Sequence, residues 1–570
     1  MDKSFEVVVA IDFGTSRSGF AYKFKEWEES VFRDLWPDSP ISYPKTATHL
    51  LLSPEGEVEA WGYTAMKKLA ELRAKKIAKD YYFARNFKME LHSGKKDKDG
   101  PYIINENNGS KIPVIDLIAD YIRLIKDEAL KEIKNSTSGE LKDEEIRWCL
   151  TIPAIWKDAD KDLMRRAAQK AGLIGSSEDE AERLFLVLEP EAAAIFCQEV
   201  DKNTLTPGTK IMIVDCGGGT IDITVHEVVK DGGLDEVTTG TGGAFGSMYV
   251  DKSFLEYLQE KLTAEMIELF QETEPVDYLQ MLEDWERTKC GFDPETSGDV
   301  VYFPIRTKLY NLISNQEPQV LEDLADEQNG DDTNIYLSRE RMESIFRPTL
   351  DGLVSTVENQ FRGLKDKDID IIFLVGGFST SPLLRQRIKE EFEERVKKIV
   401  MPPRPGVAIL KGAASFGVNP SIIRARCSRL TYGVSLTPTF IPGVHPESKK
   451  IWAEDLKKYL CMDGFGTLVH MGQKVPTDAE ITIEFKPADR NQKAMDFEFF
   501  SSPQEDVDYT DEPAVTKLGE LLVEMPFTTG GLDRVVEMTF YFGQTEIKVK
   551  AIDRTSGNEY KSSIRFSSGY

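Results

Sequence analysis

Two patterns of apolar and polar positions follow each other along the chain. Up to about residue 420, short apolar runs alternate with longer segments in which apolar residues recur at helical spacing. The runs at 146–152, 184–188 and 369–375 predict buried strands, and the segment 115–133 predicts an amphipathic helix. Strands that alternate with helices in this way indicate mixed α/β layers.

Four more segments in this part of the chain predict helices. Apolar spacing indicates them over 158–171, 254–270, 342–361 and 407–416. Ser338 precedes the third of these segments. We expect it to cap the first turn, since a serine hydroxyl accepts a hydrogen bond from a backbone N–H at that place.

From about residue 430 the pattern changes to short alternating strands. Gly, Pro, Asn and Asp break these strands, which is typical of all-β domains. Strands are predicted at 480–485, 497–500, 535–542 and 546–552, and helical spacing is weak apart from 455–460. We therefore expect a separate, small all-β domain at the C-terminal end.

Two segments about two hundred residues apart share one outline. VVVAIDFGTSRSGFAYKF (7–24) and IMIVDCGGGTIDITVHEV (211–228) each run from an apolar strand through an aspartate and a glycine turn to a second strand. Glycine lets such a turn approach a ligand closely, and successive turn N–H groups form a concave site for phosphate oxygens. The aspartate would act through Mg²⁺ and its waters, because Mg²⁺ dehydrates reluctantly.

Two such hairpins that face each other would hold one polyphosphate from both sides. This arrangement requires two similar subdomains with a cleft between them, which is a duplicated fold. A turn with a purely structural role stays the alternative for either hairpin taken alone.

Composition limits the classes of partner. The 570 residues exceed what one core organises, so several domains are expected. A formal net charge of −26 argues against generic binding to nucleic-acid backbones or anionic membranes. The acidic stretches 322–332 and 503–512 are expected to be solvated loops.

Neither export nor membrane insertion is expected. The N-terminus MDKSFEVVVAIDFG lacks the features of a secretory signal, and no apolar run approaches the roughly twenty residues that span a bilayer. Six cysteines without ligand spacing and five scattered histidines predict neither disulfides nor a zinc site. We expect a cytoplasmic protein, with the nucleus as the alternative.

Six segments carry a resemblance to a known family. They are IDFGTSRSG (11–19), LTIPAIWKDADKDLMRRAAQKAGL (150–173), LEPEAAAIF (188–196), VDCGGGTIDITV (214–225), FLVGGFSTSPLLRQRI (373–388) and PPRPGVAILKGAASFG (402–417). In this order they resemble the actin-like ATPases and, within them, the seventy-kilodalton heat-shock chaperones. The resemblance covers residues 5–418 and implies a duplicated, ribonuclease H-like α/β fold with two lobes around a nucleotide cleft. It also implies ATP or ADP with Mg²⁺ as the ligand.

The C-terminal part carries a looser resemblance. TLVHMGQKVPTDAEITIEF (467–485) and EIKVKAIDRTSGNEYKSSIRF (546–566) resemble the chaperone β-sandwich that holds client peptides. The resemblance implies a nucleotide-binding domain at 1–425 and a β-sandwich-like domain at 426–570, without the helical lid of the family. The residues that either line a peptide groove or belong to the core are Met462, Phe465 and Met471.

By resemblance, residues of two loops hold Mg²⁺ and phosphates. Asp12 and Asp215 would position Mg²⁺, largely through its waters. The phosphate contacts would come from Gly14, Thr15, Ser16, Gly217, Gly218, Gly219 and Thr220. Glu189 would hold a metal-bound or attacking water, and Asp222 would support the second loop.

A cation on the γ-phosphate completes the catalytic group that the resemblance implies, beside Asp215, Glu189 and Thr220. The candidates in the segment YYFARNFKMEL are Lys88 and Arg85. We favour Lys88, since FKMEL resembles the atypical twelfth-member branch of the family. An exposed surface lysine is the alternative interpretation of Lys88.

Nucleoside contacts are implied by two further segments. WERTKCGF (285–292) resembles the helix that grips adenosine, with Glu286 and Lys289 as ribose or base contacts. Gly376 and Gly377 lie in the adenosine motif.

Several positions depart from the family pattern. Cys290 stands where the family has an arginine that stacks on adenine, and Gly406 replaces an aspartate. Ser247 and Met248 replace a Gly-Glu pair. In place of the apolar Asp-Leu-Leu linker the chain carries Arg424, Arg426 and Arg429. These changes favour nucleotide binding over fast hydrolysis.

The first functional hypothesis is an ATP-binding, slowly hydrolysing chaperone of the atypical branch. Its implied partners are extended client peptides and co-chaperones, and a monomer is expected. A nucleotide-gated binding or signalling protein with little or no hydrolysis is the second hypothesis. A small-molecule kinase of the same superfold is the third, but the sequence offers no clear base aspartate for it.

Overall fold

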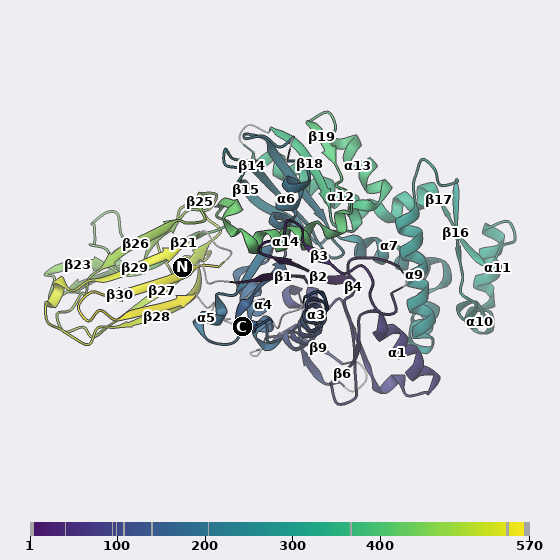
Figure 1. Ribbon diagram of the computed structural model, residues 1–570, viewed down its shortest axis with the longest axis horizontal. Helices are drawn as coiled ribbons and strands as arrows, with labels where there is room; N and C mark the ends of the chain where they lie inside the picture. Colours follow the sequence, from purple (N-terminus) through teal and green to yellow (C-terminus); the bar gives the residue numbers. More distant parts are fainter. Residues whose placement is uncertain are drawn as a thin grey trace.

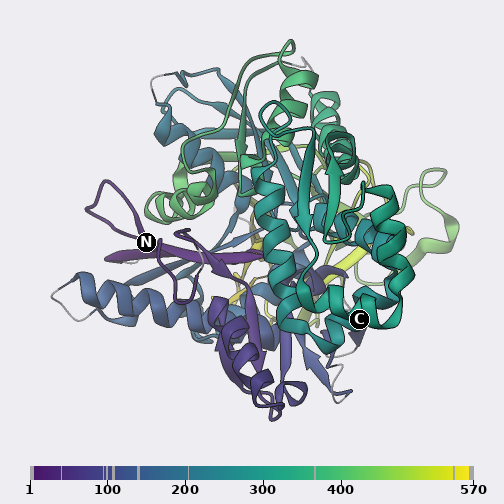
Figure 2. The same cartoon turned by 90° about the vertical axis from the view of Figure 1, so that its right-hand side faces the viewer.

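Two α/β lobes and an elongated β-rich part make up the molecule (Figure 1). The computed structural model describes residues 5–39, 41–93, 95–97, 100–105, 109–137, 141–202, 204–364, 368–542 and 546–563. Figure 2 has one lobe, in purple and blue, below the other, in green and teal, with the yellow β-rich part behind them.

The first lobe is built on a sheet with the order β12-β11-β1-β2-β3, to which β4 is added beside β2. Its central strand β1 is antiparallel to β2 and parallel to β11. The bounds are β1 Val7–Asp12, β2 Arg17–Phe24, β3 Val31–Phe32, β4 Thr46–Ala47, β11 Ile146–Ile152 and β12 Leu184–Leu188. All six residues of β1 are buried, so β1 is a core strand along its whole length.

The second lobe repeats this plan. Its sheet has the order β19-β18-β13-β14-β15-β20-β25, and β13 is antiparallel to β14 and parallel to β18. The bounds are β13 Lys210–Cys216, β14 Ile221–Val228, β15 Leu234–Gly243, β18 Ile369–Val375, β19 Val396–Val400, β20 Ile423–Cys427 and β25 Lys474–Pro476. The arrangement around β13 matches that around β1, so the two lobes have the duplicated α/β form.

Two helices join the lobes. Helix α6 (Glu189–Val200) and helix α14 (Ala408–Val418) pack on each other and share a core with strands of both sheets. A side chain at Gly412 would collide with the backbone of Ala192, so this glycine permits the close approach of the helices. The outer helices are α3 (Val114–Ser136), α4 (Asp158–Lys170), α12 (Arg339–Gly363) and α13 (Pro382–Phe392).

Smaller elements cover the cleft between the lobes. On the first lobe they are β5 (His49–Leu52), β6 (Val58–Trp61), α1 (Gly62–Ala74), β7 (Tyr82–Arg85), α2 (Phe87–Ser93), β8 (Lys95–Asp97), β9 (Gly100–Ile104) and β10 (Lys111–Pro113). On the second lobe they are α7 (Ser247–Leu262), α8 (Ala264–Thr273), α9 (Pro275–Gly291), β16 (Val300–Pro304), α10 (Thr307–Gln316), α11 (Pro318–Glu327) and β17 (Asn334–Ser338). The two covers meet where Leu279 of α9 packs with Leu51 and Leu69, and where Arg73 and Glu274 form an ion pair of 2.6 Å.

Residues from Thr431 onward form mainly strands. Two four-stranded sheets have the orders β24-β21-β27-β28 and β26-β29-β30-β31. Their bounds are β21 Thr431–Leu436, β24 Gly464–Val469, β26 Glu480–Phe485, β27 Ala494–Ser502, β28 Thr516–Glu524, β29 Val536–Tyr541, β30 Lys548–Asp553 and β31 Glu559–Ser563, with the hairpin β22 Lys450–Ala453 and β23 Lys458–Cys461 beside them. One apolar core joins the sheets, with Phe499 from the first and Met538 and Val549 from the second.

The linker continues the second-lobe sheet into the β-rich part. Strand β20 is parallel to β15, and β25 is antiparallel to β20. The expected boundary between residues 425 and 426 therefore falls inside β20. Beyond the sheet, Arg165 of α4 donates to Glu546 over 2.6 Å, and the Tyr432 hydroxyl donates to Asp158 over 3.0 Å. The β-rich part contacts both lobes.

Three sequence-based expectations were wrong. The helix expected over 254–270 is divided into α7 and α8, because Thr263 has a positive φ of 64° and its hydroxyl caps the new helix. The acidic segment 322–332 is helical as far as Glu327, the last residue of α11. This helix forms because it buries its own Leu321 and Leu324.

The third concerns 455–460, which is a turn followed by β23. Tyr459 packs across the hairpin on Trp452, with ring centroids 4.9 Å apart, so cross-strand contact outweighs the helical spacing. Residues 503–512 do form a loop. Ser338 caps α12 by accepting from the N–H of Arg341, as expected.

The three residues that either line a peptide groove or belong to the core differ in burial. Phe465 is buried beside Phe500 and Val507, whereas Met462 and Met471 are exposed. Only Phe465 therefore belongs to the core.

No helix in the part of the chain that the structure describes is long and apolar enough to cross a membrane.

Candidate functional site

A cleft between the lobes gathers the predicted site residues. Its cavity volume is about 640 Å³. The predicted residues that line it are Asp12, Gly14, Thr15, Ser16, Lys88, Glu189, Asp215, Gly217, Gly218, Gly219, Thr220, Glu286, Lys289, Gly376 and Gly377. Residues separated by more than three hundred positions are thus brought to one cavity.

The two glycine hairpins face each other across this cleft. Asp12 pairs with Gly19 in the first hairpin, and Asp215 pairs with Asp222 in the second. A side chain at Gly218 would collide with the Ser16 hydroxyl. The bare glycine therefore lets the two loops approach each other closely.

The first turn of α7 supports the second hairpin through its backbone. The N–H groups of Ser247 and Met248 donate to the carbonyls of Gly217 and Gly218 over 3.1 and 2.9 Å. These contacts need no particular side chain, so the loss of the family Gly-Glu pair leaves them intact. Ser247 lines the cavity.

Lys88 lies inside the cleft and not on the surface. It is 3% exposed, and its ammonium is 2.8 Å from Oε1 of Glu189 at the start of α6. Arg85 ends β7 in an exposed position at the cavity edge. Of the two cations that the sequence offered, Lys88 is therefore the one placed beside the predicted water-holding carboxylate.

Glu189 has an environment that opposes its ionisation. Burial raises the pKa of Glu189 to about 7, and the charges of Asp12 and Asp222 act in the same direction, while Lys88 opposes them. A carboxyl group with a pKa near neutrality is suited to exchange a proton with water.

Two further carboxylates retain free acceptor capacity. Among the described residues, Oδ1 of Asp215 and Oδ2 of Asp222 are buried without a hydrogen-bond partner. The other oxygen of Asp222 accepts from the N–H of Ile155 over 3.3 Å. Burial, followed by the charges of Glu189 and Asp222, raises the pKa of Asp215 well above its usual range.

This donor set fits a Mg²⁺ ion that keeps its waters. The orphaned Asp215 oxygen would accept a hydrogen bond from a metal-bound water without displacing it. Within the described ranges, no group of three or more His, Cys, Asp or Glu residues is arranged to hold a metal directly. The residues therefore fit the water-mediated mode and not an all-protein cage.

The side of the cleft formed by α9 carries a charge network around the buried Lys289. Lys289 lies 2.7 Å from Asp251 and 2.5 Å from Glu286, and the Trp285 indole donates to Asp251 over 2.9 Å. Cys290, on the next position of α9, is exposed to the cavity, with its sulfur 3.7 Å from Glu286. Glu286 is thus held in place before any ligand arrives.

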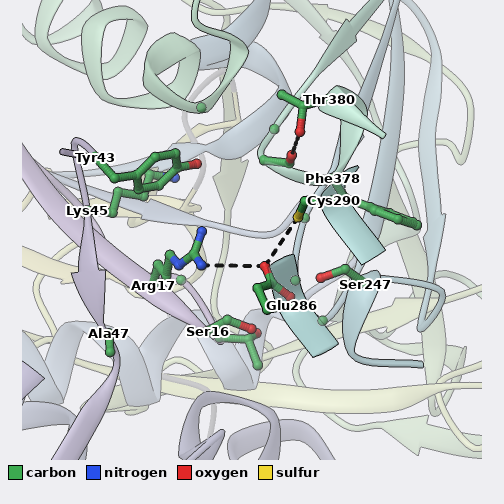
Figure 3. Close-up of a pocket in the computed structure, with 18 of the residues that line it drawn as sticks. Ser16, Arg17, Tyr43, Lys45, Ala47, Ser247, Glu286, Cys290, Phe378 and Thr380 are labelled. Carbon is green, nitrogen blue, oxygen red and sulfur yellow. Dashed lines mark hydrogen bonds and ion pairs between the residues drawn. The ribbon is translucent and has the colours of Figure 1, made fainter. Parts of the chain in front are cut away.

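Arg17 and Lys45 are cavity residues that sequence reasoning missed. Figure 3 shows both on the side of Tyr43, with Arg17 joined to Glu286. The Arg17 guanidinium lies 5.0 Å from the Tyr43 ring centroid, and Lys45 forms an ion pair of 2.6 Å with Asp12. Arg17 was visible as the residue after Ser16 in the first loop, whereas no sequence signal joined Lys45 to Asp12.

Comparison with known proteins adds an independent line of evidence. A family model described as "Hsp70 protein" matches residues 95–418. The chain is 30% identical to Heat shock 70 kDa protein 12A of Homo sapiens, over 99% of this chain and 92% of that protein. It is 29% identical to Heat shock 70 kDa protein 12B of Homo sapiens, over 99% of this chain and 91% of that protein.

A bacterial relative matches a shorter region. The chain is 26% identical to Chaperone protein DnaK of Thermosipho africanus, over 72% of this chain and 58% of that protein. The alignments with the two human proteins therefore extend over parts of the chain that the bacterial alignment leaves out.

Proposed function

Because the chain belongs to the Hsp70 family, we propose that it binds ATP between its lobes, hydrolyses it slowly and acts as an atypical chaperone. The observation that carries this proposal is the pair of glycine hairpins facing each other, with the buried Lys88–Glu189 pair beside them. Such a cleft suits a polyphosphate, because backbone N–H groups and a fixed cation converge on it.

The hydrolytic step would depend on positioning. Phosphoryl transfer passes through a loose transition state, so the protein mainly orients groups and neutralises charge. The Lys88 ammonium is 2.8 Å from Glu189, and both residues line the cavity. Mg²⁺, when bound, supplies further neutralisation of phosphate charge. Thr220 and Asp215 lie on the opposite hairpin.

A slow rate is the expected consequence of this geometry. The Lys88 ammonium is already paired with Glu189 over 2.8 Å, so a phosphate has to compete with this carboxylate for it. This same observation favours the second candidate function, a nucleotide-gated binding protein with little or no hydrolysis.

Single-turnover hydrolysis of ATP by the full chain, followed by calorimetric ATP binding, tests the proposal. We expect binding with Mg²⁺ and a slow single exponential of ADP formation. Lys88→Met should abolish the exponential and retain binding, whereas Lys67→Met, an exposed lysine of α1 paired with Asp38, should change neither. Binding without any hydrolysis would favour the nucleotide-gated candidate, and the absence of binding would overturn the proposal.

The proposed partners are extended client peptides and co-chaperones, met by a monomer in the cytoplasm. Edge strands of the two C-terminal sheets, β24, β28, β26 and β31, support peptide binding, since an extended peptide adds to an open edge. Six free thiols, five of them buried, suit a reducing compartment. Fluorescence anisotropy with labelled unfolded peptides tests the binding of client peptides, and cell fractionation tests the cytoplasmic location.

A further inference from the structure

Lys45 brings a buried positive charge to the end of β1. Its ammonium is 2.6 Å from Oδ2 of Asp12, and the two residues are only 8% and 2% exposed. A buried ion is costly unless it is paired, so both partners are held in the floor of the cleft. This ion pair is unlike the exposed pairs on the outer helices.

Backbone pairing fixes the place of Lys45. The next residue, Thr46, begins β4 and pairs with Ser18 of β2, while Asp12 pairs with Gly19 on the same hairpin. A side chain at Gly19 would approach the Lys45 Cα to 3.3 Å and its Cγ to 3.1 Å. The bare backbone at Gly19 therefore lets the lysine lie across the hairpin, directly beside Asp12.

The charge of Lys45 interacts with both hairpins. Burial lowers the pKa of its ammonium, but the charge of Asp12, with further contributions from Tyr43 and Asp215, raises it above the usual range. Lys45 is therefore protonated at neutral pH. Asp12 and Asp215 are the two carboxylates that the family resemblance assigns to the waters of Mg²⁺.

The ammonium keeps donors for a ligand. A lysine ammonium has three N–H donors, and a single carboxylate oxygen of Asp12 lies 2.6 Å from it. Lys45 lines the same cavity as the phosphate-facing glycines of the second loop. Figure 3 shows it on the side of the pocket that carries Tyr43 and Arg17, opposite Ser247. A phosphate between the hairpins lies within reach of this charge.

We propose, resting on the proposed nucleotide function, that Lys45 is a built-in counter-ion that replaces part of the charge neutralisation by Mg²⁺, so that this cleft binds ATP without a divalent cation. A fixed ammonium 2.6 Å from Asp12 weakens the attraction of this carboxylate for a hydrated cation. The same ammonium attracts the phosphate oxygens directly. Both effects reduce the difference in ATP affinity between solutions with and without Mg²⁺.

Isothermal calorimetry of ATP binding to the full chain, in Mg²⁺ and in EDTA, tests this proposal. For the wild-type protein, removal of Mg²⁺ should weaken ATP binding less than tenfold. For Lys45→Met it should weaken binding at least a hundredfold, and Lys45→Arg should restore the wild-type behaviour. Lys67→Met, an exposed lysine of α1, is the matched control and should behave like the wild type.

Each result has a distinct meaning. A loss of tenfold or more in the wild type, or equal Mg²⁺ dependence of wild type and Lys45→Met, overturns the role of Lys45 and leaves nucleotide binding intact. An absence of ATP binding in both solutions overturns the proposed function itself. The wild-type comparison needs no substitution, so it decides the matter even if Lys45→Met, which leaves Asp12 buried without its cation, does not fold.

Discussion

Arg17 of the first lobe and Glu286 of the second form an ion pair across the cleft, with 3.4 Å between Nη2 and Oε1. The guanidinium also lies over the ring of Tyr43. The Cys290 thiol donates to the same oxygen of Glu286, so the Arg17 guanidinium faces Cys290 from the wall of the cavity opposite to α9. It offers a stacking partner where the family pattern on α9 has been lost.

We predict that Arg17→Ala weakens ATP binding roughly 2–30-fold, the equivalent of a cation–π contact of about 0.5–2 kcal/mol. Cys290→Arg should restore affinity in the Arg17→Ala background. In the wild type it should tighten binding less, because two guanidinium groups would then repel each other. Calorimetry on the four proteins measures these effects.

Arg123→Ala is the matched control for this series, since Arg123 is exposed on α3, pairs with Asp120 and does not line the cavity. It should leave ATP affinity unchanged. Equal affinity of Arg17→Ala and wild type would show that Arg17 does not contact the nucleotide.

The second loop gives a prediction about rate. Asp215→Asn and Thr220→Ala should each lower single-turnover ATP hydrolysis roughly 10²–10³-fold, the usual cost of one charge-stabilising contact. Both variants should remain folded, since Asn is isosteric with Asp and Thr220 is only half-buried. Rapid-quench measurement of ADP, with circular dichroism as the folding control, checks this. Wild-type rates in both variants would remove this loop from the reaction.

The linker gives a prediction about stability. Arg426 of β20 and Glu191 of α6 form a buried ion pair of 2.6 Å. Arg426→Met leaves Glu191 buried without its cation and should destabilise the second lobe by about 3–5 kcal/mol. Arg424→Met, at an exposed linker position paired with Asp231, should cost less than about 1 kcal/mol. Denaturant unfolding measures the loss of stability in both variants. A large loss in Arg426→Met alone would show that the linker is part of the lobe, and equal small losses would show that it is only loosely attached.

Fragments test the same point without a substitution. A fragment of residues 1–425 lacks the last two residues of β20, including Arg426, whereas 1–429 keeps the whole strand. Thermal melting should therefore show the longer fragment as the more stable one. Equal melting temperatures would mean that β20 adds nothing to the lobe.

Glu236 of β15 gives a pH-dependent prediction. Burial raises the pKa of Glu236 from 4.5 to about 7, and Glu191 adds to this, against the opposing charges of Arg429 and Arg426. The folded state thus holds a proton that the unfolded state releases near pH 4.5. Stability from this group is full below that pH and is lost as the pH rises to about 7.

We therefore expect Glu236→Gln, which does not titrate, to gain stability relative to the wild type as the pH rises through this window. The full gain corresponds to about 3 kcal/mol. Melting temperatures across the pH range measure it. Glu480→Gln, at an exposed position of β26, is the control and should show no such trend. A difference that does not vary with pH would contradict the assignment.

Local signals in the sequence predicted much of the fold. The runs at 146–152, 184–188 and 369–375 became β11, β12 and β18 with the same bounds, because a continuous apolar run leaves a buried strand few alternatives. No local sequence signal marked the break between α7 and α8 at Thr263. A threonine with positive φ is uncommon, and neither glycine nor proline marked the turn.

The candidate site likewise contains residues that a local sequence signal predicted and residues that it did not. Motif residues such as Asp12 and Asp215 were predicted, since the glycine turns next to them have a recognisable spacing. Lys45 and Arg426 were not placed, because each meets its carboxylate only through tertiary pairing. Arg426 lies 235 residues from Glu191, and no local pattern connects the two positions.

The strand β20 makes the connection between the second lobe and the C-terminal part a rigid joint. Backbone hydrogen bonds run from β15 through β20 to β25 without an intervening flexible tether. A rotation of the second lobe relative to the first would carry the joined strands with it and pull on the contacts that Glu546 and Tyr432 make with α4 of the first lobe. Because the C-terminal part is elongated (Figure 1), a small angular change at the cleft becomes a large displacement at its far tip.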